Sequence, residues 1–134
     1  MKVPALLLAL AAAAGCKEGP APPPSDPCVE AGQLYVLHAR EAGQRAFDAI
    51  TDPNKRSDAE EGLEDELRAA QKKFPAACAA IGGETLRRCL RLVRQSSKEP
   101  AALDALDNDT ECKTAGDRLY KELYGAEPPS SPPW

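Results

Sequence analysis

The stretch "DTECKTAGDRLYKELY", residues 109–124, decides the fold class. Its apolar and small residues recur at intervals of three and four positions, which places them on one face of an α-helix. Gly125 follows directly, and glycine is the residue that most often ends a helix in the left-handed conformation. The stretch therefore predicts a core-facing helix with a cysteine on its buried face. That face consists of Cys112, Ala115, Gly116, Leu119 and Leu123.

Helical periodicity dominates the rest of residues 28–125, and no alternating strand pattern lasts more than a few residues. Pro75 is expected to interrupt the second helix before a short turn that carries Cys78, and Gly82-Gly83 is expected to end that turn. The sequence thus predicts an all-α fold: a small disulfide-stapled bundle of about four helices, with disordered Pro-rich segments at both ends. The predicted helices are 28–50, 57–73, 84–95 and 109–124, with a short helical segment at 100–106.

Local signals refine these boundaries. Ser57 and Glu60 have the spacing of a capping box at the start of the second helix, and Asn108 with Glu111 has the same spacing before the last one. In the first helix, Glu30 falls on the polar face, opposite an apolar stripe. Gly43 lies within that stripe and predicts a close approach by a neighbouring helix.

Composition sets limits on both stability and partners. Aromatic residues make up only 4% of the 134 residues, so the core must be built from Leu, Ala, Val and Ile. Such a core is marginal in a domain of about 100 residues without additional staples. The net charge of −4 is a poor match to nucleic acid, because nucleic-acid binding depends on a basic surface.

The beginning of the chain reads as an export signal. Lys2 precedes an apolar run from Ala5 to Ala14, which is too short to span a bilayer as a helix. Small residues then lead directly into Cys16. This pattern resembles the lipobox of bacterial lipoprotein precursors, a resemblance confined to residues 1–16. An ordinary secretory signal, which would leave Cys16 as a free thiol, is the alternative.

The resemblance implies that residues 1–15 are a lipoprotein signal peptide. Cys16 would become the first residue of the mature protein and carry covalent diacylglycerol and acyl chains, including palmitate. Lys17 follows it, and in well-studied Gram-negative lipoproteins an aspartate there favours retention in the inner membrane. The expected location is therefore the bacterial envelope, with the outer membrane favoured, at its periplasmic face or at the cell surface. Residues 16–27 would form a Pro-rich tether, and residues 126–134 a disordered Pro-rich tail.

The five cysteines support this interpretation, because setting Cys16 aside leaves an even number that can pair completely. Three pairings of the remaining four are possible. In an up-down bundle the start of the first helix and the end of the second lie at the same end, which favours Cys28–Cys78. Cys89 and Cys112 lie on the core faces of neighbouring helices, which favours Cys89–Cys112.

Few residues are candidates for a functional site. The cysteine spacing contains no zinc-knuckle pattern, and no catalytic constellation or metal site can be nominated. His38 is expected to be a partly buried structural histidine, and the acidic cluster at 58–66 a solvated face. A basic stripe could meet anionic lipid headgroups, polysaccharide or an acidic partner, or could pair within the chain. The stripe consists of Arg87, Arg91, Arg94 and Lys98.

The function expected from these observations is a membrane-anchored envelope lipoprotein that acts as a non-enzymatic interaction or structural module. The alternative is a periplasmic inhibitor or immunity-type protein that neutralises a toxin or hydrolase. The expected partners are the lipid bilayer, through the acyl anchor, and an unknown envelope protein or polysaccharide; no cofactor is expected. The segments Arg87-Arg88-Cys89 and Glu111-Cys112 loosely resemble those of uncharacterised helical envelope lipoproteins of GC-rich Gram-negative bacteria.

Overall fold

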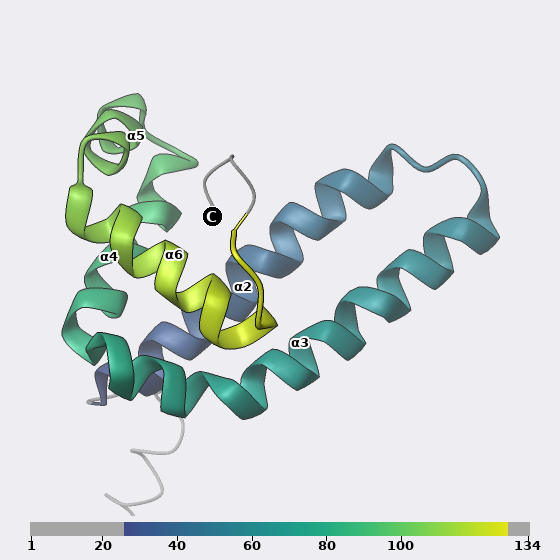
Figure 1. The fold of residues 1–134 in the computed structure, drawn as a ribbon. Coiled ribbons are helices and arrows are strands. Elements are labelled where there is room, and N and C mark those ends of the chain that lie inside the picture. Colours follow the sequence, from purple (N-terminus) through teal and green to yellow (C-terminus); the bar gives the residue numbers. More distant parts are fainter. Residues whose placement is uncertain (1–25, 129–134) are drawn as a thin grey trace, which may run out of the picture.

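The computed structural model describes residues 26–128, and this part of the chain is entirely helical outside its turns (Figure 1). Its helices are α2 (Pro27–Asp48), α3 (Pro53–Ile81), α4 (Gly83–Ser96), α5 (Pro100–Asp107) and α6 (Thr110–Tyr124). The all-α prediction is confirmed, with the short α5 as a fifth helix. The predicted signal peptide, Cys16, most of the tether and most of the tail lie outside the described residues. Within the described part, no helix is both long and apolar enough to cross a membrane.

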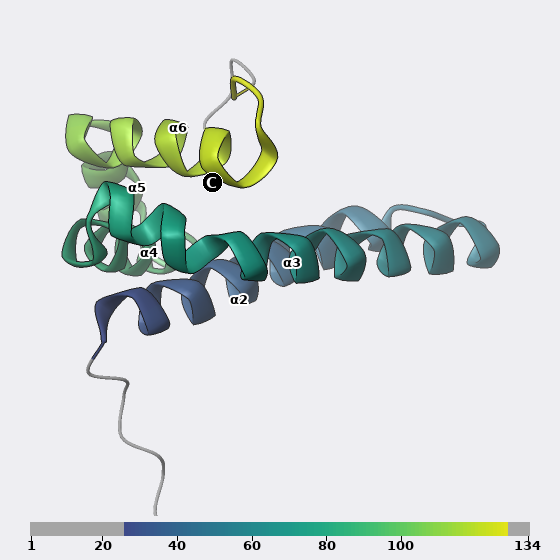
Figure 2. The ribbon, with the colours of Figure 1, turned by 60° about the horizontal axis from the view of Figure 1, so that its bottom comes forward.

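Helices α2 and α3 form an antiparallel hairpin whose outer half projects beyond the other helices (Figures 1 and 2). No residue from Leu37 to Glu66 is buried. We call residues 37–66 the distal arm. Inside it, Gly43 allows the predicted close approach, since a Cβ atom there would lie 2.5 Å from Leu63 Cδ2. Because α2 and α3 pack mainly against each other in the arm, the apolar stripe of α2 is at most half-buried there.

The core lies at the other end of the hairpin, where α4 and α6 pack against it. The faces predicted for α4 and α6 are buried in full. The α2 helix contributes Ala31, and the second half of α3 contributes Leu67, Ala70 and Phe74. The fully buried leucines and cysteines of this core are Leu67, Leu86, Leu90, Leu119, Cys78, Cys89 and Cys112.

The predicted start and end of α3 were wrong. The helix begins at Pro53, a favoured residue type for a first helical position, and the Asp52 carboxylate accepts hydrogen bonds from the amides of Asn54 and Lys55. Ser57 therefore lies inside the helix and caps nothing. The helix also continues through Pro75 to Ile81, because the turns on both sides of Pro75 are fixed by buried Phe74 and Cys78.

Two glycines make the junction between α3 and α4. Gly82 has a φ of 118°, which favours glycine, and its amide donates to the Cys78 carbonyl while its carbonyl accepts from Leu86. A Cβ atom at Gly83 would lie 3.0 Å from Cys28 Sγ. The chain thus ends one helix and starts the next within two residues, as the Gly-Gly pair predicts.

Candidate functional site

All four described cysteines are paired, and both favoured pairings are confirmed. Cys28 is bonded to Cys78 with Cα atoms 5.8 Å apart, and Cys89 to Cys112 with Cα atoms 5.4 Å apart. The first disulfide joins the start of α2 to the last turn of α3, and the second joins the core faces of α4 and α6. The first therefore closes the α2–α3 hairpin, and the second holds α6 against α4.

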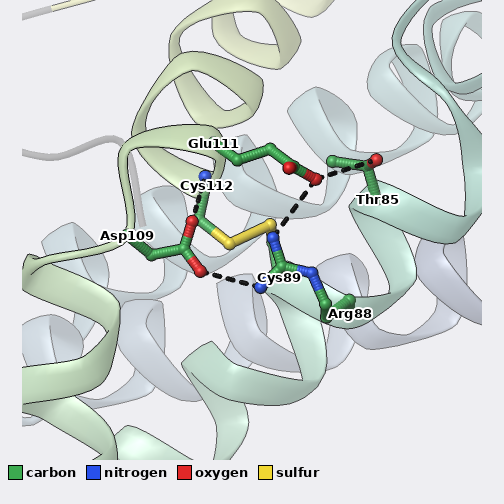
Figure 3. The surroundings of a disulfide bond; sticks show 6 residues. All are labelled: Thr85, Arg88, Cys89, Asp109, Glu111 and Cys112. Carbon is green, nitrogen blue, oxygen red and sulfur yellow. Dashed lines mark hydrogen bonds and ion pairs between the residues drawn. A yellow bond between two sulfur atoms is a disulfide. The ribbon is translucent and has the colours of Figure 1, made fainter.

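A polar network surrounds the second disulfide (Figure 3). The Asp109 carboxylate accepts from the Cys112 amide at 2.9 Å and from Arg88 Nη1 at 2.7 Å. Arg88 also pairs with Glu111, which accepts a hydrogen bond from the Thr85 hydroxyl. The hydrogen bond from Arg88 lowers the pKa of Asp109, with help from the Cys112 amide. This network fixes the first turn of α6 beside the disulfide.

The cap predicted at Asn108 was wrong by one residue. The N-cap is Asp109, and the Asn108 side chain instead donates to the Asp104 carbonyl at 2.9 Å. A charged carboxylate at this position interacts favourably with the positive end of the helix dipole, and Arg88 holds it in place. The Asn108 side chain therefore interacts with the last turn of α5 and not with the first turn of α6.

The basic stripe is occupied by carboxylates of the same chain. Arg91 donates through Nε and Nη2 to the two carboxylate oxygens of Glu30 at 2.5 and 2.7 Å. Arg87 Nη1 lies 4.0 Å from the same carboxylate, and Arg94 pairs with Glu41. Three of the four stripe residues thus connect α4 to α2, while Lys98 is exposed after α4. The intramolecular alternative describes these arginines better than a free binding face.

The position of Glu30 corrects the expected polar face of the first helix. Glu30 is the buried charged residue of the described chain, with a side chain only 11% exposed. The hydrogen bonds from Arg91 hold the pKa of Glu30 below its ordinary value of 4.5, against the opposing effect of burial. A bidentate arginine satisfies both carboxylate oxygens, which is the condition for burying such a group.

A hollow on the described surface lies between α2 and α3, at the end of the hairpin where α2 begins. It has a volume of about 650 Å³, within the range of ligand-binding pockets. We call it the α2–α3 groove. None of its lining residues comes from α4, α5 or α6. Its apolar and aromatic lining consists of Cys28, Val29, Gly32, Tyr35, Val36, Leu37, Phe74 and Pro75.

Polar groups are few in the groove. Gln33 on α2 and Gln71 on α3 supply one amide side chain from each helix. Asp26 and Arg40 are its only charged lining residues. The charge of Arg40 is neutralised by Glu64, which accepts from Nε and Nη2 at 3.0 Å each. The groove therefore offers an apolar, nearly neutral surface.

Two other titratable side chains on α2 have packing roles. Tyr35 packs on Phe74 with ring centroids 5.8 Å apart, and its hydroxyl is hydrogen-bonded to that of Tyr124. Burial, followed by that hydrogen bond, raises the pKa of Tyr35. His38 is half-buried as expected, and its pKa is lowered by burial and by nearby Arg94 and Arg45.

No family model, no curated protein and no solved structure matches this chain.

Among residues 26–128, no three His, Cys, Asp or Glu side chains are grouped so that they could hold a metal ion. The acidic cluster at 58–66 is exposed apart from half-buried Ala59, Leu63 and Glu64. Sequence reasoning located the cysteines and the basic stripe but missed the α2–α3 groove. The available signal was Val29 and Leu37, two apolar residues on the side of the first helix that otherwise reads as polar.

Proposed function

We propose that this protein is a membrane-anchored envelope lipoprotein that acts as a non-enzymatic binding module. Acyl chains at Cys16 would hold it to the bilayer, and the α2–α3 groove would be its binding surface. The observation that carries the proposal is the pairing of Cys28 with Cys78 and of Cys89 with Cys112. Disulfides of this kind form in oxidising compartments, and the two pairs use every cysteine except Cys16.

The chemistry of the groove supports binding as its role. Apolar walls with a few amide groups are typical of sites that take an apolar ligand or surface. The arginines of the basic stripe already have carboxylate partners on α2 or α4. A polyanionic partner would have to displace those carboxylates, so the groove is the better candidate surface.

The anchor is tested by the intact mass of the protein from a native membrane fraction, with and without reduction and thiol alkylation. We expect a chain that begins at Cys16, carries acyl groups, and takes up four alkyl groups only after reduction, because the remaining cysteines form two disulfides. A Cys16→Ser variant should lose the acyl mass and leave the membrane fraction. A full-length chain without acyl groups and with free thiols would refute the proposal.

A further inference from the structure

The α2–α3 groove carries two of the most exposed apolar side chains of the described chain. Val29 is 48% exposed and Leu37 is 45% exposed, and both line the groove. Eight residues apart on one helix, they project to the same side of α2. Leu103 on α5, which is 47% exposed, lies outside the groove. Exposed apolar residues gathered at a hollow indicate a contact surface, whereas a single one needs no explanation.

We propose that the α2–α3 groove rests on the lipid bilayer, with Val29 and Leu37 inserted among the outer parts of the acyl chains. This inference rests on the proposed anchor at Cys16 and names the partner of the proposed binding surface. It makes the bilayer a second, non-covalent contact of the folded domain.

The chemistry of the groove fits an uncharged apolar partner. Its walls supply no unpaired cation for a phosphate or a polysaccharide carboxylate, because Arg40 is held by both oxygens of Glu64. Asp26 at the other end accepts from the Cys28 amide at 2.9 Å as the cap of α2. Docking should therefore need no anionic lipid and should change little with salt concentration.

The position of the groove fits a surface attached through Cys16. Asp26 lines the groove and follows Cys16 by ten residues. Ten residues span at most about 35 Å when fully extended, so the bilayer would never lie far from the groove. A tether of this length makes docking an intramolecular step with a high effective concentration. Even a small apolar patch can then remain bound.

The geometry is less favourable for a second copy of this chain. A standard protein interface buries about 800 Å² on each partner, and two half-exposed side chains beside one hollow provide a small part of that area. Asp26 is one of the residues that line the groove, so the groove lies at the end of the hairpin where the described chain begins. Figure 2 shows α6 on the other side of α3 and α4 from the start of α2.

The test uses the full acylated protein in phosphatidylcholine vesicles whose acyl chains carry bromine, a contact quencher of tryptophan. Trp134, the only native tryptophan, is replaced in a Trp134→Phe background. Val29→Trp reports on the groove, and Leu103→Trp is the control with matched exposure. We expect blue-shifted, strongly quenched emission from Val29→Trp and unquenched emission from Leu103→Trp, with little difference between low and high salt.

A second substitution measures the contribution of the groove. Leu37→Asp added to the Val29→Trp chain should lower the docked population about fivefold or more, the ratio expected when half of a leucine side chain loses its apolar contact. Leu103→Asp in the same chain should leave it unchanged. Unquenched Val29→Trp emission, in a protein whose mass shows the acyl groups, would overturn the docking proposal and leave the anchor intact. Equal quenching at both positions would also overturn it, and a mass without acyl groups would overturn both proposals.

Discussion

Glu30 connects two helices that lie far apart in the sequence. Its carboxylate is buried and accepts two hydrogen bonds from Arg91, 61 residues further along the chain, while Arg87 lies 4.0 Å away. The Glu41 carboxylate, which pairs with Arg94, is 45% exposed and accepts one hydrogen bond. The contact of α4 with α2 therefore depends more on Glu30 than on Glu41, because hydrogen bonds to a buried charged group contribute more than those at an exposed one.

Replacement of this carboxylate should destabilise the fold in a pH-dependent way. Glu30→Gln should lower the Tm at pH 7 by roughly 5–10 °C, because the charge-assisted hydrogen bonds to Arg91 are weakened. Glu41→Gln, which changes a more exposed carboxylate, should lower it by about 2 °C or less. Because the pKa of Glu30 is lowered by folding, its contribution is complete above its ordinary pKa of 4.5 and is lost as the pH falls through the folded value. Thermal unfolding followed by circular dichroism should show the Glu30→Gln difference shrinking below pH 4.5. Equal losses for the two variants would contradict this role.

His38 should add a second pH dependence nearer neutrality. Burial, Arg94 on α4 and Arg45 on α2 lower its pKa from 6.5, and Glu41 partly opposes them. A lowered histidine pKa means that the unfolded chain binds the extra proton first, so stability is complete above pH 6.5 and falls as the pH drops through the folded value. The free energy of unfolding, measured in urea, should therefore fall less steeply from pH 7 to pH 5 in His38→Gln than in the parent. The difference in slope should correspond to less than one bound proton. An unchanged slope would show that His38 does not sense this environment.

The role of Glu30 could not be read from the sequence. Periodicity assigns residues to faces by polarity, so a glutamate in an amphipathic helix is placed toward water. What buries Glu30 is a bidentate arginine on another helix, and that pairing depends on tertiary contacts between distant positions. The same pattern located both disulfides, because four cysteines allow only three pairings and helix topology favours one of them.

At the scale of the helices, the start of α3 distinguishes a functional cap from a coincidental motif. Asp52→Ala should cost about 1 kcal/mol, because two backbone amides lose their acceptor. Ser57→Ala should be neutral or slightly stabilising, because Ser57 is an exposed residue inside the helix and alanine has the higher helix propensity. Equilibrium unfolding together with amide exchange at residues 54–57 measures both. A larger loss for Ser57→Ala would restore the start predicted from the capping box.

The distal arm should open without unfolding the core. None of its residues from Leu37 to Glu66 is buried, whereas α4 and α6 contain fully buried leucines and cysteines. Local opening is cheapest where few apolar contacts are lost. Native-state hydrogen exchange should therefore be faster by orders of magnitude for amides of residues 42–62 than for those of 86–93. Uniform protection across the two regions would show that the hairpin and the core unfold as one unit.

The predictability of each helix follows from what packs against it. Helices α4 and α6 were placed nearly to the residue because each buries one continuous face, which imposes a clear period on the sequence. The end of α3 was missed because Pro75 usually stops a helix, while here the buried residues beside it and the disulfide at Cys78 maintain the helical path. At Pro75, tertiary packing therefore outweighs the low helix propensity of proline.

At the scale of the whole molecule, the fold class was accessible from the sequence, whereas the α2–α3 groove was not. The fold class was inferred from hydrophobic periodicity and from the number of cysteines, and both can be read directly from the sequence. The groove lies between α2 and α3, and it is lined by residues more than 40 positions apart, such as Val29 and Pro75. Only the three-dimensional arrangement shows that their apolar side chains share one surface.

The two disulfides should each supply a large share of the stability of this small core. In the chain-entropy model, closing loops with separations of 50 and 23 residues contributes about 4 and about 3.5 kcal/mol. Domains of this size have total stabilities of only about 5–15 kcal/mol. The paired replacements Cys28→Ala with Cys78→Ala, and Cys89→Ala with Cys112→Ala, should each leave a folded but weakened protein.

Removing both disulfides should leave the chain largely unfolded at 37 °C, because the two loops do not overlap in the sequence and their contributions should add. Denaturant unfolding of the three variants and the parent measures this directly. The variant without Cys28–Cys78 should also lose protection of the first turn of α2, because that bond fixes the turn to the end of α3. The variant without Cys89–Cys112 should retain that protection and instead loosen α6. A fully reduced parent that keeps most of its stability would mean that packing of leucine and alanine suffices, and that the disulfides have little effect on the fold.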